Sequence, residues 1–364
     1  MAKDNNSKNG FLLLSQYRTA IMGFAALWIL FFHIWEPLFE FPSESGFNLF
    51  AFLEHFIKRI GFSGVDIFLL LSGSGLTYAI KKETLSVFYV RRLRRTFPPF
   101  LLVAVLRCFF EKWTVFDFLG KISGYYFYTK HIYSFLWFVP AIITFYIFFP
   151  LYYKLFSKVK YKWLLTSGVI AIWAVITFFV RGTMRIDLFA FTNRIPIFVT
   201  GVFVGYLTQN YKETVFKTRT YLILTVIFSI GLYLSYLYNF RGFLVFVPQG
   251  NTFLPNFLIA ISLPFLLAKL LDVINRHIKL LGKILLGFLG FFGAISLELY
   301  CFQDWFEKAI PYLEYFGWSH LLSNLALFFI SIALAWVTSK IFKILLWELP
   351  EKNKAKKKSA KIGT

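Results

Sequence analysis

The chain has 364 residues, of which 58% are apolar, 22% are aromatic and only 16% are charged. Its mean hydropathy of +0.64 and its low charge exclude a soluble enzyme, since soluble domains carry about 25% charged residues. A net charge of +21 would suit a protein that binds nucleic acid, but the basic residues stand in short clusters between long apolar runs. That pattern is typical of cytoplasmic loops in membrane proteins. Composition therefore predicts an all-α, polytopic transmembrane helical bundle without a nucleic-acid partner.

Ten apolar stretches are candidates for helices that cross a membrane, which need about 20 apolar residues each. They cover residues 17–37, 60–80, 97–112, 136–156, 163–180, 193–209, 220–240, 253–272, 284–304 and 320–346. Residues 113–135 are tyrosine-rich and less apolar, which is typical of a re-entrant or interfacial helix. We expect a cytoplasmic segment over 1–16, a transmembrane domain over 17–347 and a basic cytoplasmic tail over 348–364.

Lysine and arginine predict the orientation of the chain. With the N-terminus inside, the segments between spans on the cytoplasmic side contain most of the 39 basic residues. The positive-inside rule then places both termini in the cytoplasm, for a multi-pass protein of the cell (inner) membrane. The two cysteines, Cys108 and Cys301, lie in apolar stretches with no metal-ligand spacing, so we expect no metal.

Four ionisable residues lie in the outward halves of the predicted spans: His33, Glu36, Asp66 and Glu298. His33 and Glu36 are about one turn apart on one helix face, and all four have similar predicted depths. Ionisable groups inside spans are costly and mark functional sites by default, although each can instead join packed helices. We expect the four side chains to converge in one pocket.

The cytoplasmic side is rich in arginine. Arg18 opens the first span, and an arginine-rich loop, residues 88–98 (Phe-Tyr-Val-Arg-Arg-Leu-Arg-Arg-Thr-Phe-Pro), follows the second. Guanidinium groups bind phosphate through bidentate hydrogen bonds. An arginine-rich cytoplasmic loop can also serve only to set the orientation of the chain in the membrane. Arg18 and His33 are separated by about 22 Å along a helix. An elongated donor with a phosphate head would bridge that distance.

Six segments, taken in order, resemble the integral-membrane acyltransferase 3 family, over nearly the whole chain. They are residues 17–33, with an arginine and then a histidine; 64–73, Gly-Val-Asp-Ile-Phe-Leu-Leu-Leu-Ser-Gly; 92–98, Arg-Leu-Arg-Arg-Thr-Phe-Pro; 136–150, which begins Leu-Trp-Phe; 194–201, Arg-Ile-Pro-Ile-Phe-Val-Thr-Gly; and 295–300, Ile-Ser-Leu-Glu-Leu-Tyr. The resemblance implies transfer of an acyl group from cytosolic acyl-CoA to an extracytoplasmic acceptor, often a sugar.

The chain departs from the family in three places. The family's arginine stands at the position of Met22, one turn after Arg18, and the later histidine of many members is Gln303 here. No fused esterase-like domain follows the last span, so we expect that any second acyl-transfer step uses a separate extracytoplasmic transferase.

The resemblance implies a role for each candidate residue. His33 would act as general base on the acceptor hydroxyl or carry the acyl group itself, with Asp66 or Glu36 orienting its imidazole. The phosphates of acetyl-CoA, or of another acyl-CoA, would lie against Arg92, Arg95 and Arg91, with Arg18 deeper and Ser72 lining the channel. Residues expected to contact the acceptor are Arg194, Glu298, Trp137 and Tyr146.

We interpret the protein as an O-acetyltransferase that lies among membrane lipids and modifies a polysaccharide of the cell envelope. The acceptor stays open among capsular polysaccharide, lipid-linked glycan, teichoic acid, peptidoglycan and an antibiotic intermediate. The alternative is a transporter or flippase of a polar lipid-linked sugar, which needs no thioester chemistry; the lack of a recognisable internal repeat argues against it. A third interpretation is a scaffold for a separate transferase, in which His33 would be dispensable.

Overall fold

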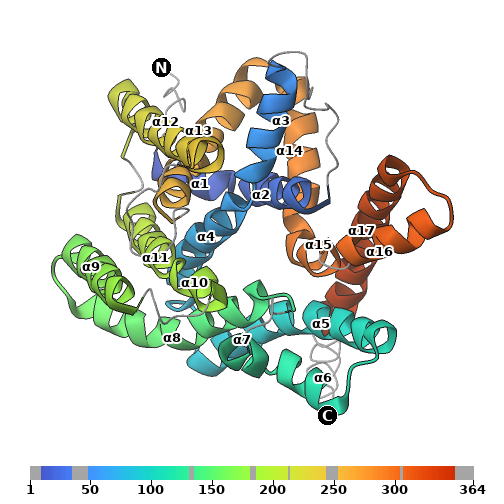
Figure 1. Ribbon diagram of the computed structural model, residues 1–364. Coiled ribbons are helices and arrows are strands. Elements are labelled where there is room, and N and C mark those ends of the chain that lie inside the picture. The colour runs from blue at the N-terminus through green and yellow to red at the C-terminus, as the bar shows by residue number, and fades with distance from the viewer. Residues whose placement is uncertain are drawn as a thin grey trace, which may run out of the picture.

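A computed structural model describes residues 10–34, 48–130, 135–180, 186–211, 214–242, 253–303 and 306–348. Within these ranges every regular element is a helix and no strand occurs, so the all-α prediction is confirmed there (Figure 1). Glu36, residues 1–9 of the predicted N-terminal segment and residues 349–364 of the predicted tail lie outside the described residues.

The described residues form seventeen α-helices. Their bounds are α1 Phe11–Gln16, α2 Arg18–Ile34, α3 Leu49–Arg59, α4 Ser63–Ala79, α5 Leu85–Glu111, α6 Val115–Ile122, α7 Tyr125–Thr129, α8 Phe138–Lys158, α9 Lys162–Val180, α10 Ile186–Thr192, α11 Ile195–Asn210, α12 Thr218–Arg241, α13 Phe253–His277, α14 Lys279–Ala294, α15 Ser296–Gln303, α16 Phe306–Tyr315 and α17 His320–Lys343, which continues as a π-helical turn over Ile344–Glu348.

Several of these helices are suited to a membrane. Judged by length and composition, the described residues contain six helices that can cross one, or up to eight if each of two bent pairs is one span. The six correspond to the predicted spans at 136–156, 163–180, 193–209, 220–240, 253–272 and 320–346. The bent pairs are α3 with α4, at 43°, and α14 with α15, at 62°. They contain the predicted spans at 60–80 and 284–304, while α2 is a shorter apolar helix.

The prediction of an arginine-rich loop over residues 88–98 is wrong. These residues lie in α5, which continues to Glu111 although Pro98 and Pro99 lie inside it. Leucine and arginine are both strong helix formers, and the helix places Arg92 and Arg95 three positions apart, on one face. The prediction also missed α1, whose Leu13 and Leu14 are buried, together with α3 and α16.

Glycines allow the central helices to approach closely. In Figure 1, α4 lies between α11 and α2, and the contacts join α2 to α14 as well. A Cβ at Gly23 of α2 would lie 1.8 Å from the carbonyl oxygen of Leu289 in α14, and a Cβ at Gly201 of α11 would lie 2.3 Å from that of Leu70 in α4. Small residues are common where helices of membrane proteins touch. These contacts fix α2 and α4 relative to their neighbours.

Gly23→Ala should therefore destabilise the protein by roughly 1–3 kcal/mol, the usual cost of overpacking, because the Cβ would meet backbone that cannot move aside. The matched control is Gly290→Ala on α14, where a Cβ would meet no atom within 4 Å. Apparent melting temperatures in detergent would measure both variants. Equal melting temperatures would contradict the close approach of α2 and α14.

Candidate functional site

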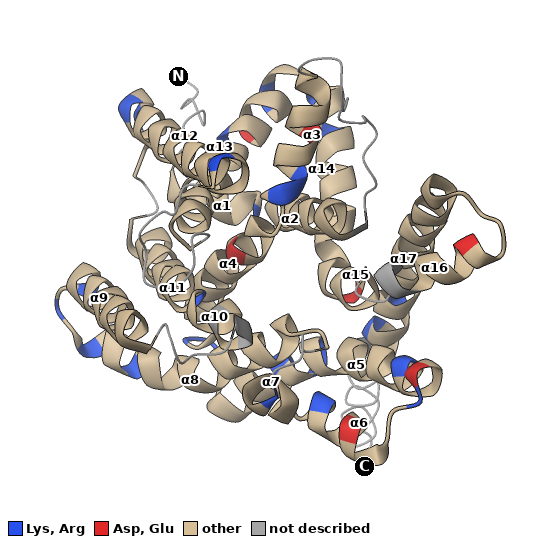
Figure 2. Ribbon diagram, in the orientation of Figure 1, with Lys and Arg blue, Asp and Glu red and all other residues tan. Residues whose placement is uncertain are grey.

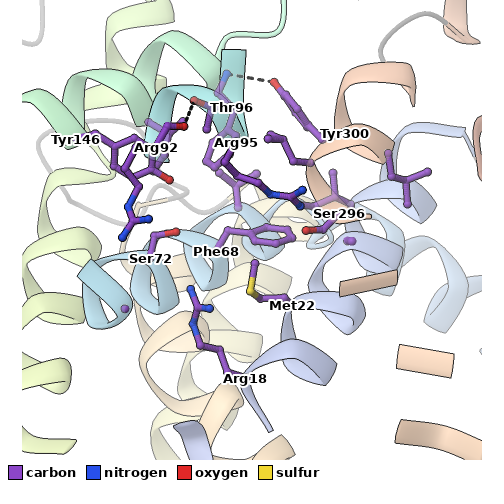
Figure 3. A pocket seen from close by; sticks show the side chains of 18 of the residues that line it. Arg18, Met22, Phe68, Ser72, Arg92, Arg95, Thr96, Tyr146, Ser296 and Tyr300 are labelled. Carbon is purple, nitrogen blue, oxygen red and sulfur yellow. Dashed lines mark hydrogen bonds between the residues drawn. The ribbon is translucent and has the colours of Figure 1, made fainter. Parts of the chain in front are cut away.

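A cavity of about 330 Å³ lies where five helices meet (Figure 3). The residues that line it come from α2 (Arg18, Met22, Ala26 and Ile29), α4 (Val65, Phe68, Ser72, Gly75 and Leu76), α5 (Arg92, Arg95 and Thr96), α8 (Phe138, Ile142 and Tyr146) and α15 (Ser296, Leu297, Leu299, Tyr300 and Gln303). The cavity thus combines three arginines with a mostly apolar wall, a combination suited to an elongated ligand with an anionic group.

The wall contributed by α2 leads toward His33. The lining residues Arg18, Met22, Ala26 and Ile29 are spaced by three or four positions, so they occupy one face of the helix. His33 stands four positions after Ile29, in the last turn of α2, and its ring packs edge-on against Phe32 at 4.8 Å. It is half-buried and is not among the lining residues. His33 therefore continues the lining face one turn beyond the cavity.

Two arginines form a cationic end of the cavity. Arg18 donates from Nη2 to the carbonyl oxygen of Leu71 at 3.3 Å, and its Nε is buried without a hydrogen-bond partner. The guanidinium of Arg92 lies over the Phe88 ring, 5.1 Å from the centroid. Within the described part of the chain, neither arginine pairs with a carboxylate, and the two charges repel each other. This arrangement favours an anion bound between them.

Two hydroxyl groups accompany these arginines: Ser72, which was expected to line the donor channel, and Tyr146, which was expected to contact the acceptor. Both residues line the cavity, and the Tyr146 side chain interacts with Ser72 and with the charges of Arg92, Arg18 and Arg95. Figure 3 shows the guanidinium groups of Arg92 and Arg18 reaching toward Ser72 from opposite sides. Hydroxyl groups donate hydrogen bonds to phosphate oxygens, so they complement the cationic end.

The third arginine is held by an acid. Arg95 donates from Nη1 to Oε1 of Glu298 at 2.9 Å and from Nη2 to Oε2 at 3.4 Å, and Nη2 also lies 3.1 Å from the carbonyl oxygen of Ala294. Glu298 is only 1% exposed. A residue expected to hold the donor is thus paired with one expected to contact the acceptor.

Asp66 lies in a separate cluster with Arg194. Its Oδ1 is 3.4 Å from Nε of Arg194, and both side chains are buried. The guanidinium of Arg194 lies over the Trp137 ring, 5.6 Å from the centroid. Figure 2 shows the acidic segments of α4 and α15 apart from each other. Asp66 lines a small pocket with Arg194, and Glu298 is not among the residues that line it. The expectation that Asp66 and Glu298 converge in one pocket is therefore wrong. That Asp66 orients the imidazole of His33 stays a prediction.

The remaining candidates lie elsewhere or outside the description. Arg91 forms an ion pair with Glu83 and is not among the lining residues, while Glu36 lies outside the described residues. In the described ranges no group of three or more His, Cys, Asp or Glu side chains could hold a metal ion. Sequence reasoning did not select the lining residues Thr96, Phe138 and Ser296, although each belongs to a segment on which the family resemblance rests.

Arg18 and Met22 line the same wall of the cavity. It can therefore be tested whether Arg18 does the work of the arginine that the family has one turn later, at position 22. An arginine side chain spans the roughly 6 Å between positions i and i+4, so Arg18 can supply the charge that the family places at position 22. Arg18→Ala should weaken binding of coenzyme A, the expected donor, by about ten- to hundredfold. Adding Met22→Arg to that variant should restore part of the affinity. Unchanged affinity in Arg18→Ala, or no recovery in a correctly folded double variant, would show that Arg18 does not take the place of an arginine at position 22.

Comparison with known proteins gives one match. No curated protein and no solved structure matches the chain significantly. The family profile described as an acyltransferase domain matches residues 20–340, which extend from the first turn of α2 into the last turn of α17. This span includes four of the five cavity-lining helices entirely and all of α2 except its first two residues. The chain therefore belongs to the acyltransferase 3 family of multi-pass membrane acyltransferases.

Proposed function

We propose that this membrane acyltransferase transfers an acyl group, with acetyl as the simplest case, from cytosolic acyl-CoA to a hydroxyl group of an extracytoplasmic or lipid-linked glycan. The observation that best supports the proposal is the cavity itself. It has a cationic end at Arg18 and Arg92, a mostly apolar middle, and a wall on α2 that leads to His33. A coenzyme A thioester has the same order of parts, from anionic phosphates through a long arm to the acyl group.

The proposal keeps a topology of ten spans with both termini in the cytoplasm of the cell (inner) membrane. The cationic end is then on the cytoplasmic side, where acyl-CoA is made. His33 is at the other end of α2, about 22 Å away along the helix axis. The donor would thus present its acyl group toward the outer side, where a glycan acceptor is reached.

Donor binding would use the groups that lack an internal counter-charge. Arg18 has a buried donor atom, Nε, without a hydrogen-bond partner, and a phosphate oxygen would satisfy it. Arg92 would contribute the second guanidinium, and Ser72 and Tyr146 the hydroxyl donors. Phe68 and Phe138 would contact the less polar arm of the thioester.

The chemistry would pass through His33. As a general base, His33 removes the proton of the acceptor hydroxyl as its oxygen attacks the thioester carbonyl carbon. The new C–O bond forms, the C–S bond breaks, and coenzyme A leaves as its thiolate. In the covalent variant the imidazole attacks the thioester carbonyl carbon, the C–S bond breaks and coenzyme A leaves as its thiolate. The acceptor oxygen then attacks the acyl group, the C–N bond to the imidazole breaks, and the released imidazole takes up the acceptor proton. Asp66 or Glu36 would orient the imidazole in either case.

The acceptor would be bound near the outer ends of α4, α8 and α11. Arg194, with Trp137 beneath its guanidinium, is the candidate for contact with a sugar or its phosphate. A separate extracytoplasmic transferase would complete any later transfer step.

Transfer of radiolabel from acetyl-CoA by purified protein in lipid nanodiscs tests the proposal directly. Wild-type protein should transfer label to a glycan acceptor or slowly to water, and His33→Ala should lower the rate by about 10²–10⁴-fold, the usual contribution of a general base. Binding of coenzyme A should be nearly unchanged in that variant. Wild-type rates in His33→Ala would contradict its role, and sugar transport without any transfer would favour the transporter. Glycans of cells with and without the gene would identify the acceptor by loss of the acetyl mass increment.

Arg92 should distinguish coenzyme A from its dephospho form if it contacts the 3′-phosphate. Removing one charge-assisted contact costs about 1.5–3 kcal/mol, so Arg92→Ala should weaken coenzyme A binding about ten- to hundredfold. The loss for dephospho-coenzyme A should be smaller. The matched control is Arg94→Ala, because Arg94 is exposed on the same helix and is not among the lining residues. Equal losses for both ligands would show that Arg92 does not contact the 3′-phosphate.

A further inference from the structure

The break between α14 and α15 leaves backbone carbonyl groups that need hydrogen-bond partners from outside α14. α14 ends at Ala294, α15 begins at Ser296, and their axes differ by 62°. The last carbonyl groups of a helix have no partner within the helix. In a membrane such groups must be satisfied by protein or by water in a cavity. The break between Ala294 and Ser296 therefore needs a hydrogen-bond donor from elsewhere in the fold.

Arg95 supplies that donor from α5. Its Nη2 lies 3.1 Å from the carbonyl oxygen of Ala294, at the end of α14. Its two terminal nitrogens also donate to Glu298, at 2.9 and 3.4 Å, in the first turn of α15. A cation at the C-terminus of one helix and an acid in the first turn of the next both complement the helix dipoles. One guanidinium thus donates hydrogen bonds to groups on both sides of the break, the Ala294 carbonyl oxygen and the Glu298 carboxylate.

The acid that completes this arrangement is well buried. Glu298 is 1% exposed, and its carboxylate interacts with Ser339 of α17 as well as with Arg95. It therefore connects α5, α15 and α17 at one point. The charge of Arg95, whose side chain is 43% exposed, is already paired with this carboxylate, whereas Arg18 and Arg92 have no carboxylate partner among the described residues and therefore have the greater need of a donor phosphate.

The element that this pair places is a wall of the cavity. Five residues of the eight-residue helix α15 line it, among them Tyr300 and Gln303. The hydroxyl of Tyr300 accepts a hydrogen bond from the backbone N–H of Phe138, at the start of α8, at 3.1 Å. Rotation of α15 at the break would move these side chains relative to the bound donor.

We propose that Arg95 and Glu298 are positioning residues: together they cap the break between α14 and α15 and thereby place the α15 wall of the cavity, and Arg95 does not hold the donor phosphate. The proposal rests on the proposed function for the identity of the donor. It reassigns both residues, since Arg95 was expected to bind the donor and Glu298 the acceptor.

The test compares Arg95→Met with the double variant Arg95→Met/Glu298→Leu. The single variant leaves a buried carboxylate without its counter-charge and should lower the apparent melting temperature by about 5 °C or more. The double variant removes both charges and should recover most of that loss. The control is Arg94→Met on the same helix, which should change neither melting temperature nor coenzyme A binding.

Donor affinity and transfer rate should then separate. In the double variant, the affinity for coenzyme A should stay within about threefold of wild type, whereas the transfer rate at saturating acetyl-CoA should fall at least about tenfold because α15 is less well placed. Arg92→Met should show the opposite pattern, with weaker binding and a nearly normal saturated rate.

Three outcomes would overturn the proposal. The first is a loss of coenzyme A affinity of about tenfold or more in the double variant that is smaller for dephospho-coenzyme A, which would show that Arg95 reads the phosphate. The second is a wild-type transfer rate in the double variant, and the third is no recovery of its melting temperature. If wild-type protein did not bind coenzyme A, the proposed function would fail, while the melting temperatures would still test the cap.

Discussion

The cost of burying a charged side chain in an apolar bundle accounts for much of the arrangement around the cavity. An arginine inside such a bundle needs a counter-charge or a set of acceptors, because removing it from water costs several kcal/mol otherwise. Buried Arg194 lies 3.4 Å from Asp66, and the buried carboxylate of Glu298 lies 2.9 Å from Arg95, whose own side chain is 43% exposed. Arg18 and Arg92 have no carboxylate within the described residues. We therefore expect an anionic ligand to supply the counter-charge for these two arginines.

Close packing of the helices fixes α2 and α4, which carry one of the two arginines and the serine beside it. Gly23 and Gly293 bring α2 and α14 to within contact of each other's backbone, and Gly73 and Gly201 do the same for α4 and α11. Since α2 carries Arg18 and α4 carries Ser72, these contacts determine where the cationic end forms.

The sequence predicted the helical class and most of the cavity's polar residues, but not their pairing. Long apolar runs require helices, and six of the ten predicted spans correspond to single helices of suitable length. Arg18, Ser72, Arg92, Arg95 and Tyr146 were selected in advance and line one cavity. Glu298, the partner of Arg95, is 203 positions away in the sequence. The pattern of apolar residues predicts individual helices but not which side chains of distant helices pair. The break at Ile295 was missed because the apolar run over 284–304 contains no proline and is continuous across it. The charge of the arginine-rich segment, residues 88–98, is typical of a cytoplasmic loop, but its leucine and arginine content favours the helix that forms.

An experimental structure of the protein with coenzyme A bound would test the central claim most directly. The account predicts that a phosphate group of the ligand lies between the guanidinium groups of Arg18 and Arg92, beside Ser72, with the thioester end toward His33. Arg95 should still contact Glu298 and the carbonyl oxygen of Ala294 in that complex. A phosphate bound to Arg95 with its contact to Glu298 broken, or coenzyme A bound outside the cavity, would contradict the account.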